Sequence, residues 1–162
     1  MLKAIDRPHA AKVELYDELA AQLRGLVETE SDEIANMANC AALLFHSLPD
    51  LNWAGFYLLR GDELVLGPFQ GRPACVRIPL GRGVCGTAAI QRRVLRVPDV
   101  CAFADHIACD SASRAEIVLP LMTADARLLG VLDLDSPTLD RFDQSDETGL
   151  HALAAIMVTK LS

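Results

Sequence analysis

The clearest structural signal lies in residues 114–135, RAEIVLPLMTADARLLGVLDLD. Arg114–Thr123 and Leu128–Asp135 are apolar runs of strand length, and the polar segment Ala124–Arg127 between them has the length of a turn. Strands joined by so short a connection pair antiparallel. This stretch therefore predicts an antiparallel sheet at the centre of the fold.

The flanking segments add further strands and helices. The sequence predicts strands at Asn52–Arg60, Glu63–Phe69, Cys75–Leu80 and Val94–Val97, and a crossover helix at Val84–Arg92. It predicts terminal helices over Ala10–Glu28, from Ser31 or Asp32 to Pro49, and from near Asp143 onward. This order gives an α+β fold in which a mostly antiparallel sheet of about six strands is flanked by N- and C-terminal helices. The loop Pro98–Ser113 shows no clear period, and loops of that length are usually functional or disordered.

Three carboxylates interrupt the apolar strands. Alternation places Glu116 on the same face of its strand as Val118, and it places Asp133 and Asp135 on the same face as Val131. One face of an antiparallel sheet is often open to water, so the acids could simply be solvated there. A pocket is the other interpretation.

The pocket is favoured because the strand Asn52–Arg60 carries Trp53, the only tryptophan, on the same face as Tyr57. Three predicted helices are also available to cover the sheet. A half-covered face with an aromatic floor and acids at its rim suits a small ligand that is positively charged or forms hydrogen bonds.

Composition indicates one globular domain over residues 1–162, since 51% of the chain is hydrophobic and 23% is charged. A formal net charge of −7 argues against a nucleic-acid backbone or an anionic membrane as partner. No apolar run approaches the roughly 18–20 residues of a membrane span. The N-terminal stretch Met1–Pro8 carries no export signal, so we expect a cytoplasmic protein.

Five cysteines are the main functional clue: Cys40, Cys75, Cys85, Cys101 and Cys109. They include no CxxC pair, and a structural disulfide framework is not expected in a reducing compartment. Cys40 lies in a predicted helix and is expected to be a core residue. The other four are clustered between Cys75 and Cys109, which suggests a shared role.

Cys85 stands at the start of the predicted crossover helix. A helix N-terminus lowers the pKa of a thiol, so Cys85 is a candidate reactive thiolate. The surrounding GRGVCG, residues 81–86, is only a weak dinucleotide-binding signal. No Lys-Ser/Thr follows it, and it does not open a βαβ unit with a suitably spaced acid.

Cys109 ends the long loop beside turn-forming residues, where a thiol can be exposed. Zinc binding by Cys101, His106, Cys109 and an earlier cysteine is an alternative use, although the spacing lacks the tight ligand pairs of structural zinc sites. A cysteine or serine hydrolase is less favoured, because only His106 of the four histidines lies near the candidate site.

Three motifs in order carry a family resemblance: PACVRIPLGRGVCGTA (Pro73–Ala88), HIACDSASRAEIVLPL (His106–Leu121) and GVLDLDSP (Gly130–Pro137). They resemble the free methionine-(R)-sulfoxide reductases, enzymes built on a stand-alone GAF domain. The resemblance runs from about Leu44 to Phe142. It implies a GAF-like fold, a thiol-dependent oxidoreductase that acts on free methionine sulfoxide without a metal or cofactor, thioredoxin as reductant, and a homodimer.

The resemblance also implies roles for individual residues. Cys109 matches the cysteine that attacks the sulfoxide sulfur, Cys75 the usual resolving cysteine and Cys85 the third family cysteine. The implied substrate-binding residues are Trp53, Tyr57, Glu116, Asp133 and Asp135.

The implied chemistry needs a protonated carboxyl. Glu116 or Asp135 would hydrogen-bond the sulfoxide oxygen, and crowding of three acids in a semi-buried pocket would raise the pKa of such a carboxyl. Cys109 would become a sulfenic acid. Cys75 or Cys85 would then close a disulfide that thioredoxin reduces.

One segment departs from the family pattern. In DVCAFADH (Asp99–His106), Cys101 and Asp105 stand where the family usually has His and Gly. The alternative function is a non-catalytic GAF-type sensor that binds a small ligand in the same pocket. It is disfavoured because the chain has no second effector domain and reactive cysteines would be superfluous.

Overall fold

The computed structural model describes residues 9–161, so Met1–Pro8, where no export signal was found, lies outside the described residues, as does Ser162. The helices are α1 (His9–Val27), α2 (Glu33–Ser47), α3 (Gly83–Gln91) and α4 (Gln144–Val158), with a short 3-10 helix, η1, at Val100–Ala102. The strands are β1 (Trp53–Arg60), β2 (Glu63–Gly71), β3 (Arg77–Pro79), β4 (Leu95–Val97), β5 (Ala115–Met122) and β6 (Leu128–Ser136). No described helix is both long enough and apolar enough to span a bilayer.

The strands form one sheet in the order β3-β2-β1-β6-β5-β4, and every neighbouring pair is antiparallel. This confirms the predicted α+β class and the sheet of about six strands. Because β6 pairs with both β1 and β5, the register aligns the predicted site residues. Asp135 stands opposite Trp53 on one side and opposite Glu116 on the other.

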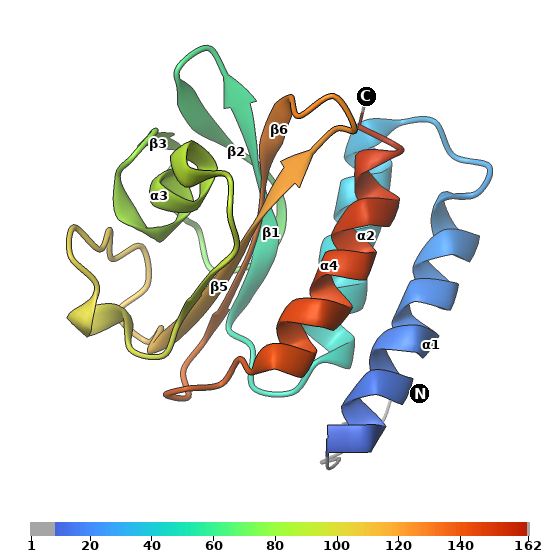
Figure 1. Cartoon of the computed structure of the whole chain (residues 1–162), viewed down its shortest axis with the longest axis horizontal. Coiled ribbons are helices and arrows are strands. Elements are labelled where there is room, and N and C mark those ends of the chain that lie inside the picture. Colours follow the sequence, from blue (N-terminus) through green and yellow to red (C-terminus); the bar gives the residue numbers. More distant parts are fainter. Residues whose placement is uncertain (1–8, 162) are drawn as a thin grey trace.

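The sheet separates two hydrophobic clusters (Figure 1). On one face α2 and α4 pack against the strands, and α1 packs on both helices. On the other face α3 lies against β5 and β6. Phe56 belongs to the helical cluster, whereas its strand neighbour Tyr57 belongs to the cluster under α3. This division confirms the faces predicted from strand alternation.

Buried Asp146 ties α4 to α1. Its side chain is 1% exposed and accepts hydrogen bonds from Tyr16 Oη (2.9 Å), Lys12 Nζ (2.8 Å) and Arg141 Nη1 (3.1 Å). It also completes a capping box with Asp143 at the start of α4. These partners compensate the burial of the carboxylate, so the anchor holds α1 and α4 together.

The structure refines two local expectations. Strand β3 covers Arg77–Pro79 within the predicted segment Cys75–Leu80, and the Cys75 carbonyl before it accepts a hydrogen bond from Tyr57 Oη at 2.9 Å. The loop Pro98–Ser113 contains η1, which forms because Asp99 Oδ1 accepts a bond from Cys101 N at 3.0 Å. The second difference comes from a side chain that satisfies a backbone group locally.

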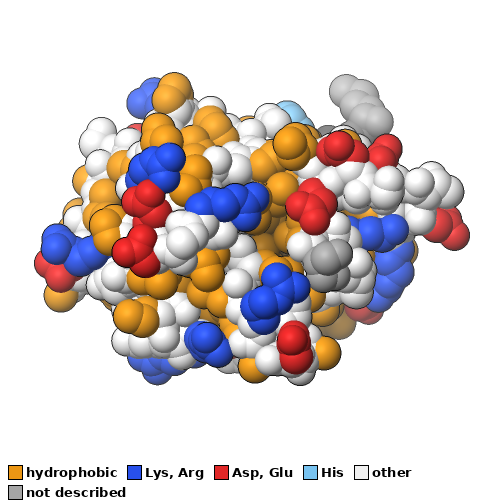
Figure 2. Space-filling model, turned by 90° about the horizontal axis from the view of Figure 1, so that it is seen from above, with side chains coloured by type: hydrophobic (Ala, Val, Ile, Leu, Met, Phe, Trp, Pro, Cys, Tyr) orange, Lys and Arg blue, Asp and Glu red, His pale blue; other side chains and the backbone are white. Residues whose placement is uncertain are grey.

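Charged side chains are mixed on the surface in Figure 2, which looks onto the molecule from above the view of Figure 1. Acidic and basic groups alternate there around hydrophobic areas. This face therefore offers no uniformly basic surface to a nucleic-acid backbone.

Candidate active site

A cavity of about 40 Å³ lies on the α3 side of the sheet. It is bounded by β1, β5, β6, α3 and the loop Pro98–Ser113. Its walls include all but one of the predicted site residues: Trp53, Tyr57, Cys85, Cys109, Glu116, Asp133 and Asp135. The remaining one, Cys75, is bonded to Cys109. The structure thus brings together every residue that the sequence singled out for the site.

Cys75 and Cys109 form a disulfide, with Cα atoms 5.7 Å apart. The bond joins the segment before β3 to the loop before β5. Cys109 is exposed and Cys75 is half-buried, so the disulfide lies where the loop meets solvent. The sequence left Cys75 and Cys85 as alternative partners, and the structure pairs Cys109 with Cys75 while Cys85 stays a free thiol.

Three carboxyl groups form the floor of the cavity. Glu116 is 6% exposed and Asp133 is 5% exposed, which excludes the interpretation that these acids lie on an open, solvated face of the sheet. Burial raises the pKa of Glu116 and of Asp135 well above the usual values, and nearby negative charges raise both further. Burial also raises the pKa of Asp133 to about 6. The predicted rise is confirmed, but burial contributes more to it than mutual crowding.

The burial of Cys85 argues against the predicted reactive thiolate. Cys85 does lie in the first turn of α3, but it is 4% exposed and its Sγ is 3.8 Å from Glu116 Oε1. Burial raises the pKa of this thiol well above its usual value, and the charges of Asp133 and Glu116 add to the rise. Desolvation and the two carboxyls outweigh the dipole of a short helix. Cys85 is therefore a neutral thiol that faces the acids.

An aromatic stack forms another wall. The Trp53 ring stacks against Tyr57 and against Phe69, with ring centroids 5.8 Å and 5.3 Å away. Trp53 Nε1 donates to the Arg72 carbonyl at 3.2 Å, which fixes the indole. Gly55 permits this packing, because a Cβ there would lie 2.8 Å from the Trp53 ring.

Comparison with known proteins identifies the family to which the chain is similar. A GAF domain model matches residues 18–160. The free methionine-R-sulfoxide reductase of Escherichia coli is 54% identical over 144 residues, which cover 89% of this chain and 87% of that protein. The structure of the free methionine-R-sulfoxide reductase from Neisseria meningitidis in complex with its substrate is 45% identical, covers 99% of this chain and 95% of that one, and has a TM-score of 0.90.

This chain belongs to the free methionine-R-sulfoxide reductase family. A structure from Burkholderia vietnamiensis, called a putative GAF sensor protein, is also similar, with 60% identity, a TM-score of 0.89 and coverage of 91% and 93%. This similarity is further evidence of the shared GAF domain, but it does not distinguish a sensor from a reductase.

The departures from the reductase family pattern have simple structural consequences. Asp105 has a φ of 61°, a conformation that favours Gly and that Asp tolerates better than most residues. Cys101 is exposed and free, and Cys40 is buried in the core as expected. The zinc set that included Cys101 and Cys109 is not formed, because the Cys109 sulfur is committed to the disulfide.

Sequence reasoning missed a polar group at the rim of the reductase-family pocket. Asn52 Nδ2 donates to Ser113 Oγ at 3.0 Å and to Asp110 Oδ2 at 3.3 Å. Arg72 Nη1 lies 3.9 Å from Asp110 Oδ1. Asp110 directly follows Cys109, and that adjacency was the available signal.

His106 was considered above only as a zinc ligand or a hydrolase base. Its Nε2 atom lies 3.9 Å from Glu116 Oε2, and burial lowers the pKa of its imidazole.

Proposed function

We propose that this protein reduces free L-methionine-(R)-sulfoxide to methionine with two cysteine thiols as the electron source. The observation that carries the proposal is the Cys75–Cys109 disulfide at the edge of a cavity floored by three carboxyls of raised pKa. A disulfide is the product that such a reduction leaves on the enzyme. Membership in a family whose relatives are named free methionine-R-sulfoxide reductases supports the same reaction.

The first step joins the Cys109 sulfur to the sulfoxide sulfur. Cys109 attacks as the thiolate, and a protonated carboxyl, Glu116 or Asp135, gives its proton to the sulfoxide oxygen as that bond forms. The oxygen then passes to the Cys109 sulfur, which becomes a sulfenic acid, and methionine departs. Methionine sulfur is reduced by two electrons and Cys109 sulfur is oxidised by two.

The second step releases the oxygen. The Cys75 thiol attacks the Cys109 sulfenic sulfur, water leaves, and the disulfide forms. Cys85 is the less suitable partner, because its thiol is buried against Glu116 and Asp133 with a strongly raised pKa. A thioredoxin-type dithiol then reduces the disulfide by exchange, starting at the exposed side of the bond.

The pocket also suggests why a free amino acid would be the substrate. Trp53 and Tyr57 offer an apolar wall for the methylsulfinyl end, and a carboxyl group among Asp133, Asp135 and Asp110 would hold the ammonium group. The loop carrying Cys109 forms part of the cavity wall, next to the disulfide. Reduction of the disulfide would release this loop and widen access to the cavity.

The test is NADPH oxidation in the presence of thioredoxin and thioredoxin reductase. We expect turnover with free L-methionine-(R)-sulfoxide, and at least about 100-fold less with the S epimer or with the R epimer inside a peptide. If the protein binds the sulfoxide but no NADPH is oxidised, whichever dithiol reductant is supplied, the result would instead support the non-catalytic GAF-type sensor.

A further inference from the structure

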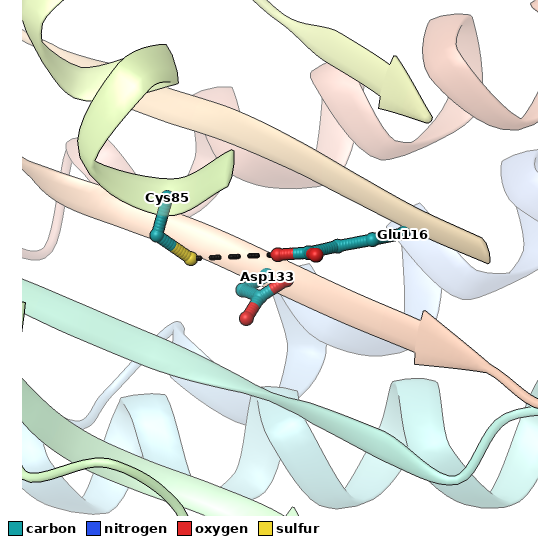
Figure 3. Close-up of side chains that lie close together, drawn as sticks. All are labelled: Cys85, Glu116 and Asp133. Carbon is teal, nitrogen blue, oxygen red and sulfur yellow. Dashed lines mark hydrogen bonds between the residues drawn. The ribbon is translucent and has the colours of Figure 1, made fainter. Parts of the chain in front are cut away.

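One buried cluster combines a thiol with two carboxyls. Cys85 comes from α3, Glu116 from β5 and Asp133 from β6, and the three side chains point toward a common centre (Figure 3). One ligand atom from each lies within 4.8 Å of the others, and Cys85 Sγ is 3.8 Å from Glu116 Oε1. All three residues are buried.

The cluster has little positive charge of its own. Among residues 9–161, the ion pair recorded for these three side chains is that between His106 and Glu116, at 3.9 Å. No Lys or Arg side chain of the described part forms a salt bridge with either acid of the cluster. Buried acids without a cationic partner favour binding of a proton or another cation.

Asp133 supplies an independent observation. Its Oδ1 atom is buried and accepts no hydrogen bond from any described residue. An unpartnered buried acceptor costs about 1–3 kcal/mol, and native proteins seldom carry one without a ligand or function. The carboxylate of Asp133 is therefore available to a bound ion within the cluster.

We propose that Cys85, Glu116 and Asp133 form a binding site for Zn²⁺. Zinc accepts thiolate at about 2.3 Å and carboxylate oxygen at about 2.0–2.2 Å in a tetrahedron. In such a tetrahedron a sulfur and an oxygen ligand lie about 3.5 Å apart, close to the 3.8 Å between Cys85 Sγ and Glu116 Oε1. His106 or a water completes the coordination. The thiolate excludes Mg²⁺ and Ca²⁺, which take oxygen ligands.

Zinc at this position would regulate the enzyme by inhibition. The ion would occupy Glu116, a candidate proton donor, and Asp133, a candidate partner of the substrate ammonium, so Zn²⁺ and methionine sulfoxide would compete. This competition rests on the proposed function, whereas metal binding does not. The site is distinct from the redox pair, because neither Cys75 nor Cys109 is among its ligands.

The disulfide form makes a direct test possible. In a Cys101→Ser protein with the Cys75–Cys109 bond intact, Cys85 and the core residue Cys40 are the remaining free thiols. Titration with Co²⁺ is expected to give one equivalent of bound metal with a sulfur-to-cobalt charge-transfer band, and Zn²⁺ is expected to displace it. A Cys85→Ala change on this background should abolish the band and weaken Zn²⁺ binding by at least about tenfold. Cys40→Ala should change neither.

Glu116→Gln and Asp133→Asn give a second measure that keeps the thiol. Each should weaken Zn²⁺ binding by about tenfold or more. A cobalt spectrum without the sulfur band, or one unchanged by Cys85→Ala, overturns the proposal. If the metal binds as expected but reduced protein shows no sulfoxide reduction, the zinc site stands and the proposed function fails.

Discussion

Tyr57 Oη donates a hydrogen bond of 2.9 Å to the backbone carbonyl of Cys75. Tyr57 is buried in β1 and stacks against Trp53, so the sheet itself fixes the position of one disulfide cysteine. The other cysteine, Cys109, stands on a loop. One cysteine of the disulfide is therefore fixed by the sheet, and the other lies on a loop.

Tyr57→Phe tests this arrangement, because it keeps the ring and removes the donor. We expect a loss of about 1 kcal/mol of stability. We also expect slower disulfide closure after a normal first release of methionine, since Cys75 is less well fixed. Methionine release and loss of free thiols would be followed in a single turnover. Tyr16→Phe is the matched control, because its hydroxyl bonds to Asp146 on the opposite face. Equal slowing in both variants would contradict the role given to Tyr57.

Cysteine substitutions should separate the two steps of the reaction. Cys109→Ser is expected to abolish methionine formation, because a hydroxyl is a far weaker nucleophile than a thiolate. Cys75→Ser is expected to release about one equivalent of methionine and then to cycle slowly with thioredoxin. Cys101→Ser serves as the control and should cycle normally, since that thiol is exposed and unpaired. Normal cycling of Cys75→Ser, or a dominant Cys101–Cys109 link in peptide mass spectra, would assign the resolving role to a cysteine other than Cys75.

Glu116→Gln removes the acidic proton while keeping the shape of the side chain. We expect kcat/KM for free methionine sulfoxide to fall by about 100-fold or more, the range typical of losing a general acid. Asp135→Asn should produce a loss of similar size if it shares this role. Asp125→Asn, a fully exposed acid on the turn before β6, should leave kcat/KM unchanged. Unchanged kinetics in both pocket variants would remove the carboxyls from the mechanism.

We expect the Asp133→Asn variant to be more stable than the natural protein, by an amount that depends on pH. The folded pKa of Asp133 is about 6, compared with 3.8 for an ordinary aspartate, so ionisation opposes folding as pH rises from about 4 through 6. The amide variant should match the natural protein near pH 4. Above pH 7 it should be more stable by about 3 kcal/mol, because each pKa unit corresponds to about 1.4 kcal/mol. Denaturant unfolding at both pH values measures the difference, and a variant less stable above pH 7 would refute the interpretation.

Strand alternation predicted most of the site. A period of two residues fixes which side chains share a face, so the grouping of Trp53 and Tyr57 with the three acids followed from the sequence alone. Local signals also predicted helix starts at Ser31 or Asp32 and near Asp143, and the structure has Asp32 and Asp143 as the N-caps.

Features that depend on how deeply a side chain is buried, and on how the loops pack, could not be predicted in the same way. The helix-start position of Cys85 indicated a lowered pKa, but the covering loop and the facing acids buried the thiol and reversed the sign. The choice of Cys75 as partner of Cys109 depends on how the loop folds back, because spacing along the chain does not order the possible disulfides. Asn52, Asp110 and Ser113 meet only in three dimensions.

The position of Asp146 on the far side of the sheet has a practical consequence for engineering. This anchor joins α4 to α1, whereas the acids and Cys109 line the cavity beside α3. Figure 1 shows α1 and α4 on the opposite side of the sheet from α3. A tether or a dye attached to the outer side of α1 would leave the mouth of the pocket facing solution. Heat-resistant variants can accordingly be selected in the helical layer while the chemistry under α3 keeps its native residues.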